Sequence, residues 1–259
     1  MRGVVGMTFE MREGERLDDL QVRGMQIIQS KEVFSFSLDA VLLARFASLR
    51  NKDRVIDLGT GNGVIPLLLA ARSSASRAEI VGLEIQARLA DMAQRNVEGN
   101  RLQEIINIVH GDTREAVQTF GSESFDLVVC NPPYRPAGVG DQSLNEHVKI
   151  AKHEITCTLE QAMDAAAGLV RYEGKVAFVH RPDRLADIFT AMRARKLEPK
   201  RMLLVHPRPD NRPNIVLVEA IKGGRPELRI DPPLIVHQAD GSYTEEILAL
   251  YAGRGELAT

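Results

Sequence analysis

The chain contains no tryptophan and few aromatic residues of any kind. Phenylalanine and tyrosine together make up 5% of its 259 residues. Proteins that bind single-stranded nucleic acid without sequence preference stack successive bases on aromatic side chains. The composition therefore gives no sign of an extended base-stacking platform.

Cysteine is also rare, and long apolar runs are absent. Cys130 and Cys157 are too few for a disulfide framework, and we interpret Cys130 as a small buried apolar residue. No apolar run approaches the 18 residues of a membrane-spanning helix. Residues 1–7 are too short for a signal peptide, and Met7 is an alternative start to Met1. We therefore expect a reduced, soluble protein of the cytoplasm.

The histidines do not form a recognisable metal motif. No two of them have the spacing of metal ligands on one helix, and no cysteine cluster supports them, so we predict no metal site. A structural hydrogen bond is the preferred role for His153, and the role of Glu154 stays open. The six histidines are His110, His147, His153, His180, His206 and His237.

Apolar segments of strand and helix character alternate along the chain, and 44% of the residues are hydrophobic. Alternation of this kind predicts right-handed βαβ units and a parallel sheet. Strands are expected at residues 55–58, 78–83, 105–109, 125–130, 175–180, 201–205 and 214–221. Helices are expected at residues 38–49, 64–72, 159–170, 185–195 and 245–251. The last two strands have no helix between them, which predicts an antiparallel pair at the sheet edge.

We expect one domain over residues 1–259. Residues 1–50 form a polar lead-in and a helix, residues 51–222 the catalytic core, and residues 223–259 a C-terminal extension. The extension is interrupted by glycine and proline, and its function stays open.

One motif, Asn131-Pro132-Pro133-Tyr134, follows the apolar run 125–130. This run predicts a buried parallel strand, and open α/β sheets bind ligands at the carboxyl ends of such strands. The Asn131 side-chain carbonyl and a backbone carbonyl could accept hydrogen bonds from a planar NH2 group, while Tyr134 stacks on its ring or amide. On these four residues alone, a proline-rich turn capped by Asn131 is the alternative.

A glycine-rich turn follows an earlier predicted strand, with the sequence Asp57-Leu58-Gly59-Thr60-Gly61-Asn62-Gly63. Its glycines let a ligand approach the backbone, and the next helix begins with free N–H groups. The G-x-G-x-G spacing differs from the G-x-G-x-x-G of dinucleotide binders, so NAD is disfavoured. Asp57 would repel a pyrophosphate but could hold an ammonium group.

Two further carboxylates follow the next two predicted strands. Glu84 suits bidentate bonding to two ribose hydroxyls, and Asp112 could accept from an adenine amino group. An amino acid, a ribose and an adenine together describe S-adenosylmethionine. Unrelated polar residues at these strand ends are the less favoured interpretation.

These motifs resemble those of the class I S-adenosylmethionine-dependent methyltransferases, and among them the NPPY amino-methyltransferases. Other segments are similar to the bacterial family that methylates N6 of an adenine beside the anticodon of a valine tRNA. These segments are residues 34–44, 151–154, 178–182 and 205–207. Lys152 stands where that family usually has arginine.

The resemblance implies an α/β, Rossmann-like fold. Its sheet has seven mostly parallel strands with an antiparallel edge hairpin, and helices cover both faces. Asn131, Pro132 and Tyr134 would be catalytic in a direct displacement without a general base. Cofactor-binding roles are implied for Phe36, Asp39, Asp57, Gly59, Thr60, Gly61, Glu84, Ile85, Asp112, Thr113 and Asn131.

The charge is unevenly distributed although the net charge is −2. Nine Lys/Arg and four Asp/Glu lie between Arg181 and Arg212, a local charge of +5. A basic region near the catalytic face would suit RNA phosphates, but an ordinary solvated surface fits the sequence as well.

Two other functions compete with RNA methylation. Protein glutamine N5-methyltransferases also carry NPPY, but they resemble this chain only in the core and have a separate helical domain ahead of it. Only 56 residues precede Asp57 here, which disfavours that interpretation. A non-catalytic RNA-binding or assembly module is disfavoured by the intact NPPY. The exact RNA target, the modified position and the oligomeric state stay open.

Overall fold

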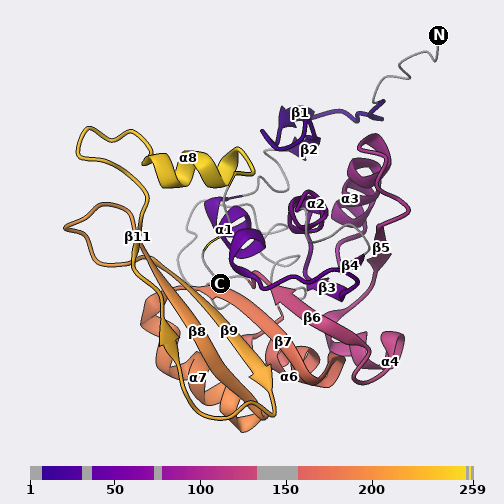
Figure 1. Ribbon diagram of the computed structural model, residues 1–259. Helices are drawn as coiled ribbons and strands as arrows, with labels where there is room; N and C mark the ends of the chain where they lie inside the picture. Colours follow the sequence, from indigo (N-terminus) through magenta and orange to yellow (C-terminus); the bar gives the residue numbers. More distant parts are fainter. Residues whose placement is uncertain (1–7, 31–36, 73–77, 133–156, 255–256, 258–259) are drawn as a thin grey trace, which may run out of the picture.

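A computed structural model describes residues 8–30, 37–72, 78–132, 157–254 and 257 of the chain. Within them, one large sheet crosses the molecule, with helices packed on both of its faces (Figure 1). The predicted Rossmann-like α/β class is confirmed.

Seven long strands build the sheet in the order β5-β4-β3-β6-β7-β9-β8. They are β3 (Arg54–Leu58), β4 (Glu79–Glu84), β5 (Ile106–His110), β6 (Phe125–Cys130), β7 (Val170–His180), β8 (Leu197–His206) and β9 (Ile215–Lys222). The first five run parallel to one another, whereas β9 is antiparallel to both β7 and β8. The expected antiparallel pair is therefore present, and β8 returns to the direction of the parallel strands.

The helices divide between the two faces of the sheet. They are α1 (Leu38–Phe46), α2 (Val64–Ala70), α3 (Ala87–Gly99), α4 (Ala116–Phe120), α6 (Leu159–Leu169), α7 (Leu185–Ala194) and α8 (Glu245–Tyr251). One core contains α1 and α2 with Val129 and Ala177, and the other contains α6 and α7 with Val128 and Phe178. Alternate residues of β6 and β7 thus enter opposite cores, which explains their continuous apolar runs.

Two strands extend beyond their expected bounds. β7 begins at Val170 instead of 175, and β8 begins at Leu197 instead of 201. The start of β8 contains Pro199, which cannot donate a ladder hydrogen bond. A register shift between Pro199 and Arg201 accommodates it, and the sequence pattern gave no sign of that irregularity.

The lead-in before α1 contains a hairpin that the sequence pattern did not predict. β1 (Glu15–Asp19) and β2 (Gln26–Ser30) form an antiparallel hairpin separate from the main sheet. β1 has the sequence ERLDD, which has no alternation of apolar and polar residues to indicate a strand. It is a strand because it pairs with β2, whose last four residues are buried.

Short elements complete the C-terminal extension. β10 (Arg229–Ile230) and β11 (Leu234–Ile235) each pair parallel with β8 at the sheet edge. Helix α8 occupies the predicted residues and packs beside α1 (Figure 1). Its first turn is capped by the Thr244 side chain, which accepts a hydrogen bond from the backbone N–H of Ile247.

Candidate active site

The predicted site residues follow the carboxyl ends of neighbouring strands. β3 lies between β4 and β6, and Leu58 is in register with Leu83 on one side and Cys130 on the other. Glu84 and Asn131, each one residue further along, therefore lie on either side of the turn that begins at Gly59. The structure thus brings Gly59, Glu84 and Asn131 together at the carboxyl ends of the parallel strands. Open α/β sheets bind their ligands at this end of the strands.

Two glycines of the turn are required for different reasons. Gly59 and Gly63 have φ of +73° and +83°, which side chains other than glycine rarely adopt. A Cβ at Gly59 would meet nothing within 4 Å, whereas a Cβ at Gly63 would lie 3.2 Å from that of Ala93. Gly59 therefore leaves open space for a ligand, and Gly63 allows close packing on α3.

Asp57 is the most unusual carboxylate of the structure. It is completely buried, and among the described residues neither of its oxygens has a hydrogen-bond partner. Burial raises its pKa to about 7, and the charge of Glu84 adds to this. The Thr60 hydroxyl acts in the opposite direction, although its geometry falls short of a hydrogen bond, since Thr60 Oγ1 has no partner either.

Unsatisfied buried polar atoms are rare in folded proteins and need an explanation. Here Asp57, Thr60 and Asn62 contribute four such oxygens within one turn. A bound group with several donors, such as an ammonium, would satisfy them and favour the ionised form of Asp57. These four oxygens can accept hydrogen bonds and therefore fit the ammonium group at the amino-acid end of S-adenosylmethionine.

Glu84 is fixed by the backbone around it. Its two carboxylate oxygens accept hydrogen bonds from the N–H of Gly61 and of Gln86, both at 2.9 Å. Burial raises its pKa, and these N–H groups counteract the shift. Each oxygen keeps further acceptor capacity, as bonding to two ribose hydroxyls requires.

The Asp112 carboxylate is less available to an adenine amino group than the sequence suggested. Its side chain accepts hydrogen bonds from the backbone N–H of Arg114 at 2.8 Å and from the Arg114 guanidinium. The bond from the Arg114 side chain is the main reason why the pKa of Asp112 is lowered. Asp112 caps the short helix η2 (Thr113–Glu115), which contains Thr113. An adenine amino group would have to share this carboxylate with Arg114.

The other predicted residues have mixed outcomes. Asp39 is half-buried in the first turn of α1, and the Ile85 carbonyl lies 2.9 Å from Nε2 of His110. Pro132 is buried beside the half-buried Asn131. Phe36 and Tyr134 lie outside the described residues, as do the Ala-Lys-His-Glu run at 151–154 and most of the loop 131–147. Their roles stay predictions.

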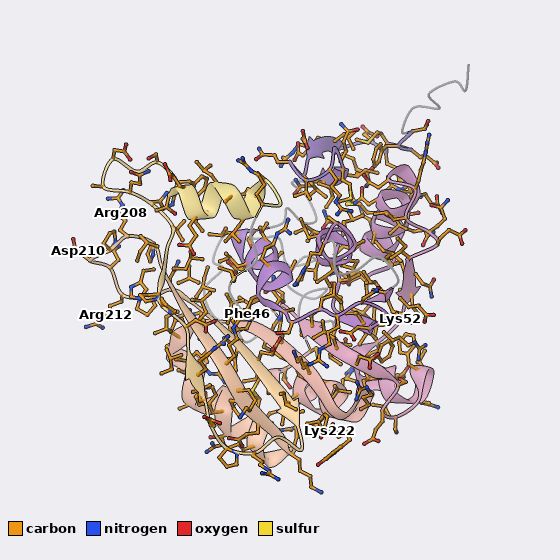
Figure 2. The ribbon with its side chains drawn as sticks, in the orientation of Figure 1. Phe46, Lys52, Arg208, Asp210, Arg212 and Lys222 are labelled. Carbon is orange, nitrogen blue, oxygen red and sulfur yellow. The ribbon has the colours of Figure 1, made fainter. Side chains whose placement is uncertain are left out.

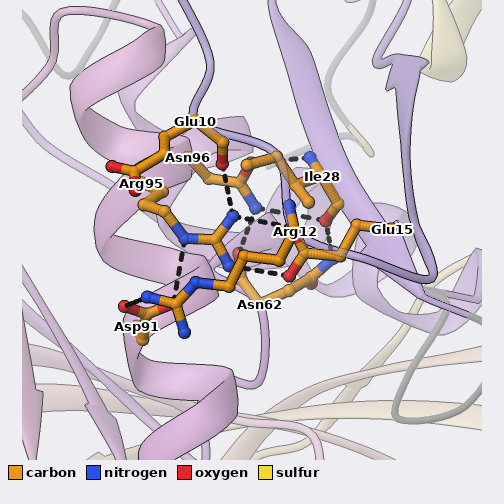
Figure 3. Close-up of polar contacts among 8 residues, drawn as sticks. All are labelled: Glu10, Arg12, Glu15, Ile28, Asn62, Asp91, Arg95 and Asn96. Carbon is orange, nitrogen blue, oxygen red and sulfur yellow. Dashed lines mark hydrogen bonds and ion pairs between the residues drawn. The ribbon is translucent and has the colours of Figure 1, made fainter.

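No sequence pattern indicated Asn96, whose side chain connects the hairpin to the glycine-rich turn (Figure 3). Its Oδ1 accepts from the N–H of Ile28 at 2.6 Å, and its Nδ2 donates to the carbonyl of Asn62 at 2.9 Å. The Asn62 side chain donates to the Ile28 carbonyl at 3.1 Å. A buried asparagine inside a helix indicates a polar partner, but not which segment supplies it.

A buried ion pair holds the same hairpin (Figure 3). The Arg95 guanidinium donates to both carboxylate oxygens of Glu15 at 2.7 Å, and their side chains are 6% and 1% exposed. Arg95 also donates to Asp91 and to the Glu10 carbonyl. These contacts fix β1 on α3, the helix that follows the strand of Glu84.

The chain is similar to known methyltransferases. A family described as Methyltransferase small domain matches residues 24–168, more than half of the chain. The chain belongs to this family. It is 30% identical over 203 residues to the tRNA1(Val) (adenine(37)-N6)-methyltransferase of Porphyromonas gingivalis, covering 75% of this chain and 76% of that protein. The protein of the same name from Bacteroides thetaiotaomicron is 29% identical over 226 residues, covering 87% and 92%.

Solved structures show the same fold. A protein of Agrobacterium tumefaciens named as a predicted O-methyltransferase has a TM-score of 0.69 at 26% identity, covering 85% of this chain and 99% of that one. Geranyl diphosphate C-methyltransferase from Streptomyces coelicolor has a TM-score of 0.52 at 12% identity, covering 71% and 76%. These findings confirm the methyltransferase resemblance, and the chain is a methyltransferase.

In the described part of the chain no helix is long and apolar enough to cross a membrane. The same part contains no cluster of three or more His, Cys, Asp or Glu side chains that could hold a metal ion.

Proposed function

We propose that this methyltransferase modifies N6 of an adenine in tRNA, beside the anticodon. The observation that carries the proposal is the position of Asn131 and Pro132, directly after β6 and beside the glycine-rich turn. The relatives from P. gingivalis and B. thetaiotaomicron, whose names contain this reaction, support the choice of acceptor. An enzyme that modifies tRNA works where tRNA is used, so the proposal includes a cytoplasmic location.

The methyl donor is S-adenosylmethionine, whose sulfonium supplies an electrophilic methyl group without a covalent protein intermediate. We assign its ammonium to Asp57, whose buried oxygens have no partner in the protein. Its ribose is assigned to Glu84, which the N–H groups of Gly61 and Gln86 hold in place. Asp112 is the adenine acceptor only if it shares its oxygens with Arg114.

Asn131 addresses the weak nucleophilicity of the acceptor. The lone pair of an adenine N6 is delocalised into the ring. Hydrogen bonds from the NH2 group to the Asn131 side chain and the Pro132 carbonyl would localise that lone pair on nitrogen. Tyr134 would orient the ring by stacking, and positioning with electrostatics would supply most of the rate acceleration. The base must leave its stack to reach Asn131, which favours an adenine in a loop.

The deciding experiment is transfer of a labelled methyl group to an unmodified valine tRNA transcript with adenine at position 37. We expect labelled N6-methyladenosine after nuclease digestion. The matched substrate carries guanine at position 37 and should remain unlabelled. Parallel incubation with total cellular protein tests the glutamine alternative. Label in protein and not in RNA would replace the proposal with that alternative, and no label in either would overturn both acceptors for this methyltransferase.

A further inference from the structure

Most arginines of the basic stretch between Arg181 and Arg212 already pair with carboxylates of the protein, so fewer of them are available to RNA phosphates than the net charge suggested. Five of its arginines form ion pairs with carboxylates. These pairs are Arg181 with Asp183, Arg184 with Asp187, Arg193 with Glu198, Arg195 with Asp164 and Arg201 with Asp231. Arg208 and Arg212 remain exposed on the loop between β8 and β9, and within the described part of the chain neither forms an ion pair.

This loop follows the carboxyl end of β8, on the same side of the sheet as the carboxyl ends that carry the candidate active site. β8 has the direction of β6, because both neighbours of β9 are antiparallel to it. Three strand spacings of about 4.8 Å separate β6 from β8, or roughly 14 Å across the sheet. At about 3.4 Å for each stacked nucleotide, that distance corresponds to roughly four nucleotides.

The loop is ordered by its own contacts. Nδ1 of His206 lies 2.7 Å from the Asn211 carbonyl, and the Asn211 N–H donates to the Arg208 carbonyl at 3.1 Å. Figure 2 shows the loop protruding from the body of the protein, with Asp210 at its tip between the two arginines. The arginines are therefore presented on a preformed turn.

An exposed aromatic side chain lies in the neighbouring segment. Residues 234–237 run along the end of β8, and the His237 N–H donates to the Pro207 carbonyl at 3.0 Å. Tyr243 stacks on the His237 ring with centroids 4.9 Å apart and planes at 16°. Tyr243 is 40% exposed, so the stack leaves part of the tyrosine open to solvent.

The two segments meet at Arg208. A Cβ placed on Gly241 would lie 3.9 Å from Nη2 of Arg208, so the guanidinium reaches the turn that precedes Tyr243. Tyr243 also contacts Tyr251 of α8, with ring centroids 5.7 Å apart. Burial is the main reason why the pKa of Tyr251 is raised to about 12, and the neighbouring Tyr243 adds to the shift.

We propose that Arg208, Arg212 and Tyr243 form a docking surface for the tRNA strand that flanks the target adenine. The inference rests on the proposed function. Arg208 and Arg212 would contact phosphates, and Tyr243, already stacked on His237, would stack on an unpaired base. Four exposed carboxylates lie near these residues in the chain: Asp210 in the loop, Asp240 before Tyr243, and Glu245 and Glu246 in the first turn of α8. Asp240 is turned to its own loop, where it accepts hydrogen bonds from the backbone N–H and hydroxyl of Ser242.

The test measures binding of a fluorescein-labelled valine tRNA transcript to the enzyme saturated with S-adenosylhomocysteine. Tyr243→Ala should weaken binding about tenfold, and Tyr243→Phe should retain most of it, since the ring face does the stacking. Replacing Arg208 and Arg212 together by glutamine should lower the slope of log affinity against log salt by roughly 1 to 2. Asp210→Asn should strengthen binding.

The controls are an exposed tyrosine and an exposed arginine at the other end of the strands, away from the candidate active site. Tyr172, at the amino end of β7, is 61% exposed, and Arg225 is exposed after the end of β9. Tyr172→Ala and Arg225→Gln should leave tRNA affinity unchanged. Melting temperature and S-adenosylhomocysteine affinity should be unchanged in the Arg208 and Arg212 variants and in Tyr243→Phe, because the two arginines are exposed and phenylalanine keeps the ring. Tyr243→Ala also removes the ring stacked on His237, so its tRNA binding is measured well below its own melting temperature and at unchanged S-adenosylhomocysteine affinity.

The outcomes separate this inference from the proposed function. If the wild type methylates the transcript but the Tyr243 and arginine variants bind it like the wild type, the docking surface is wrong and the function stands. If the wild type methylates no RNA, both are overturned. Equal losses in the surface and control variants would also overturn the docking surface, since they would show nonspecific attraction.

Discussion

The two ends of the chain attach to the fold through different polar contacts. Both ends bury apolar residues, such as Ile27 in the hairpin and Ile247 in the C-terminal segment. The hairpin is also held by Arg95 with Glu15 and by Asn96 with Ile28, whereas the C-terminal segment is also held by backbone pairing with β8 and by Arg201 with Asp231. The polar contacts of the hairpin reach the glycine-rich turn, whereas the C-terminal attachment leaves Tyr243 exposed. The first end thus supports the cofactor side, and the second offers a surface to a partner.

The largest effect is expected from the N-terminal attachment. Arg95→Gln leaves the buried Glu15 carboxylate without its main partner, and should lower the free energy of unfolding by about 3–5 kcal/mol. Arg12→Gln is the matched control, because the Arg12–Asp91 pair is largely exposed and should contribute at most about 1 kcal/mol. Urea denaturation of both variants measures the difference. Equal losses would mean that burial of the pair does not matter.

The rate of methyl transfer should not depend on the N-terminal hairpin or on the C-terminal segment. Asn131→Ala removes one of two acceptors that act on the nucleophile as the methyl group arrives, so kcat should fall at least about 10²-fold. Affinity for S-adenosylhomocysteine should change little. Tyr134→Phe should keep most of the activity, because the ring face does the stacking. Near wild-type kcat in Asn131→Ala would reduce the NPPY motif to a rigid turn.

Cofactor binding should depend on the turn that the hairpin supports. Glu84→Ala leaves two ribose hydroxyls without their acceptor and should weaken cofactor binding by about 1–3 kcal/mol. Calorimetry with S-adenosylhomocysteine measures it. Asn96→Ala should produce a smaller loss in the same experiment, because Asn96 acts on the turn only through Asn62 and Ile28. Unchanged affinity in a folded Glu84→Ala variant would refute the ribose assignment.

The smallest effect is a pH dependence at Asp57. Its pKa of about 7 in the folded protein lies above that of an unfolded aspartate, so folding stability from this group is lost as the pH rises toward 7. Cofactor binding has the opposite sign, since an ammonium prefers ionised Asp57. Below pH 7, affinity for S-adenosylhomocysteine should fall by up to about tenfold per pH unit. In Asp57→Asn this slope should disappear and affinity should be low throughout, while stability at pH 8 should rise.

The amino-acid sequence was sufficient to predict the parallel sheet, the glycine-rich turn and the strand-end positions of Glu84 and Asn131. These features are local, because an apolar strand and the polar residue that ends it are contiguous in the chain. The alternation of strands and helices then brings parallel strand ends to one edge. Asp112 shows the limit of this reasoning, since Arg114, only two residues away, competes for its oxygens.

The hairpin, two of the ion pairs and the approach of Gly241 to Arg208 depended on contacts that form only in the folded protein. Glu15 pairs with Arg95, 80 residues further along, and no local pattern in ERLDD indicates that partner. Arg181, Arg184 and Arg193 pair with carboxylates two to five residues away, whereas Arg195 and Arg201 pair with the distant Asp164 and Asp231. The turn at Gly241 lies near Arg208, and the segment before it includes β11, which pairs with β8. Long-range contacts of this kind depend on the assembled sheet, and the residues at either end do not specify them alone.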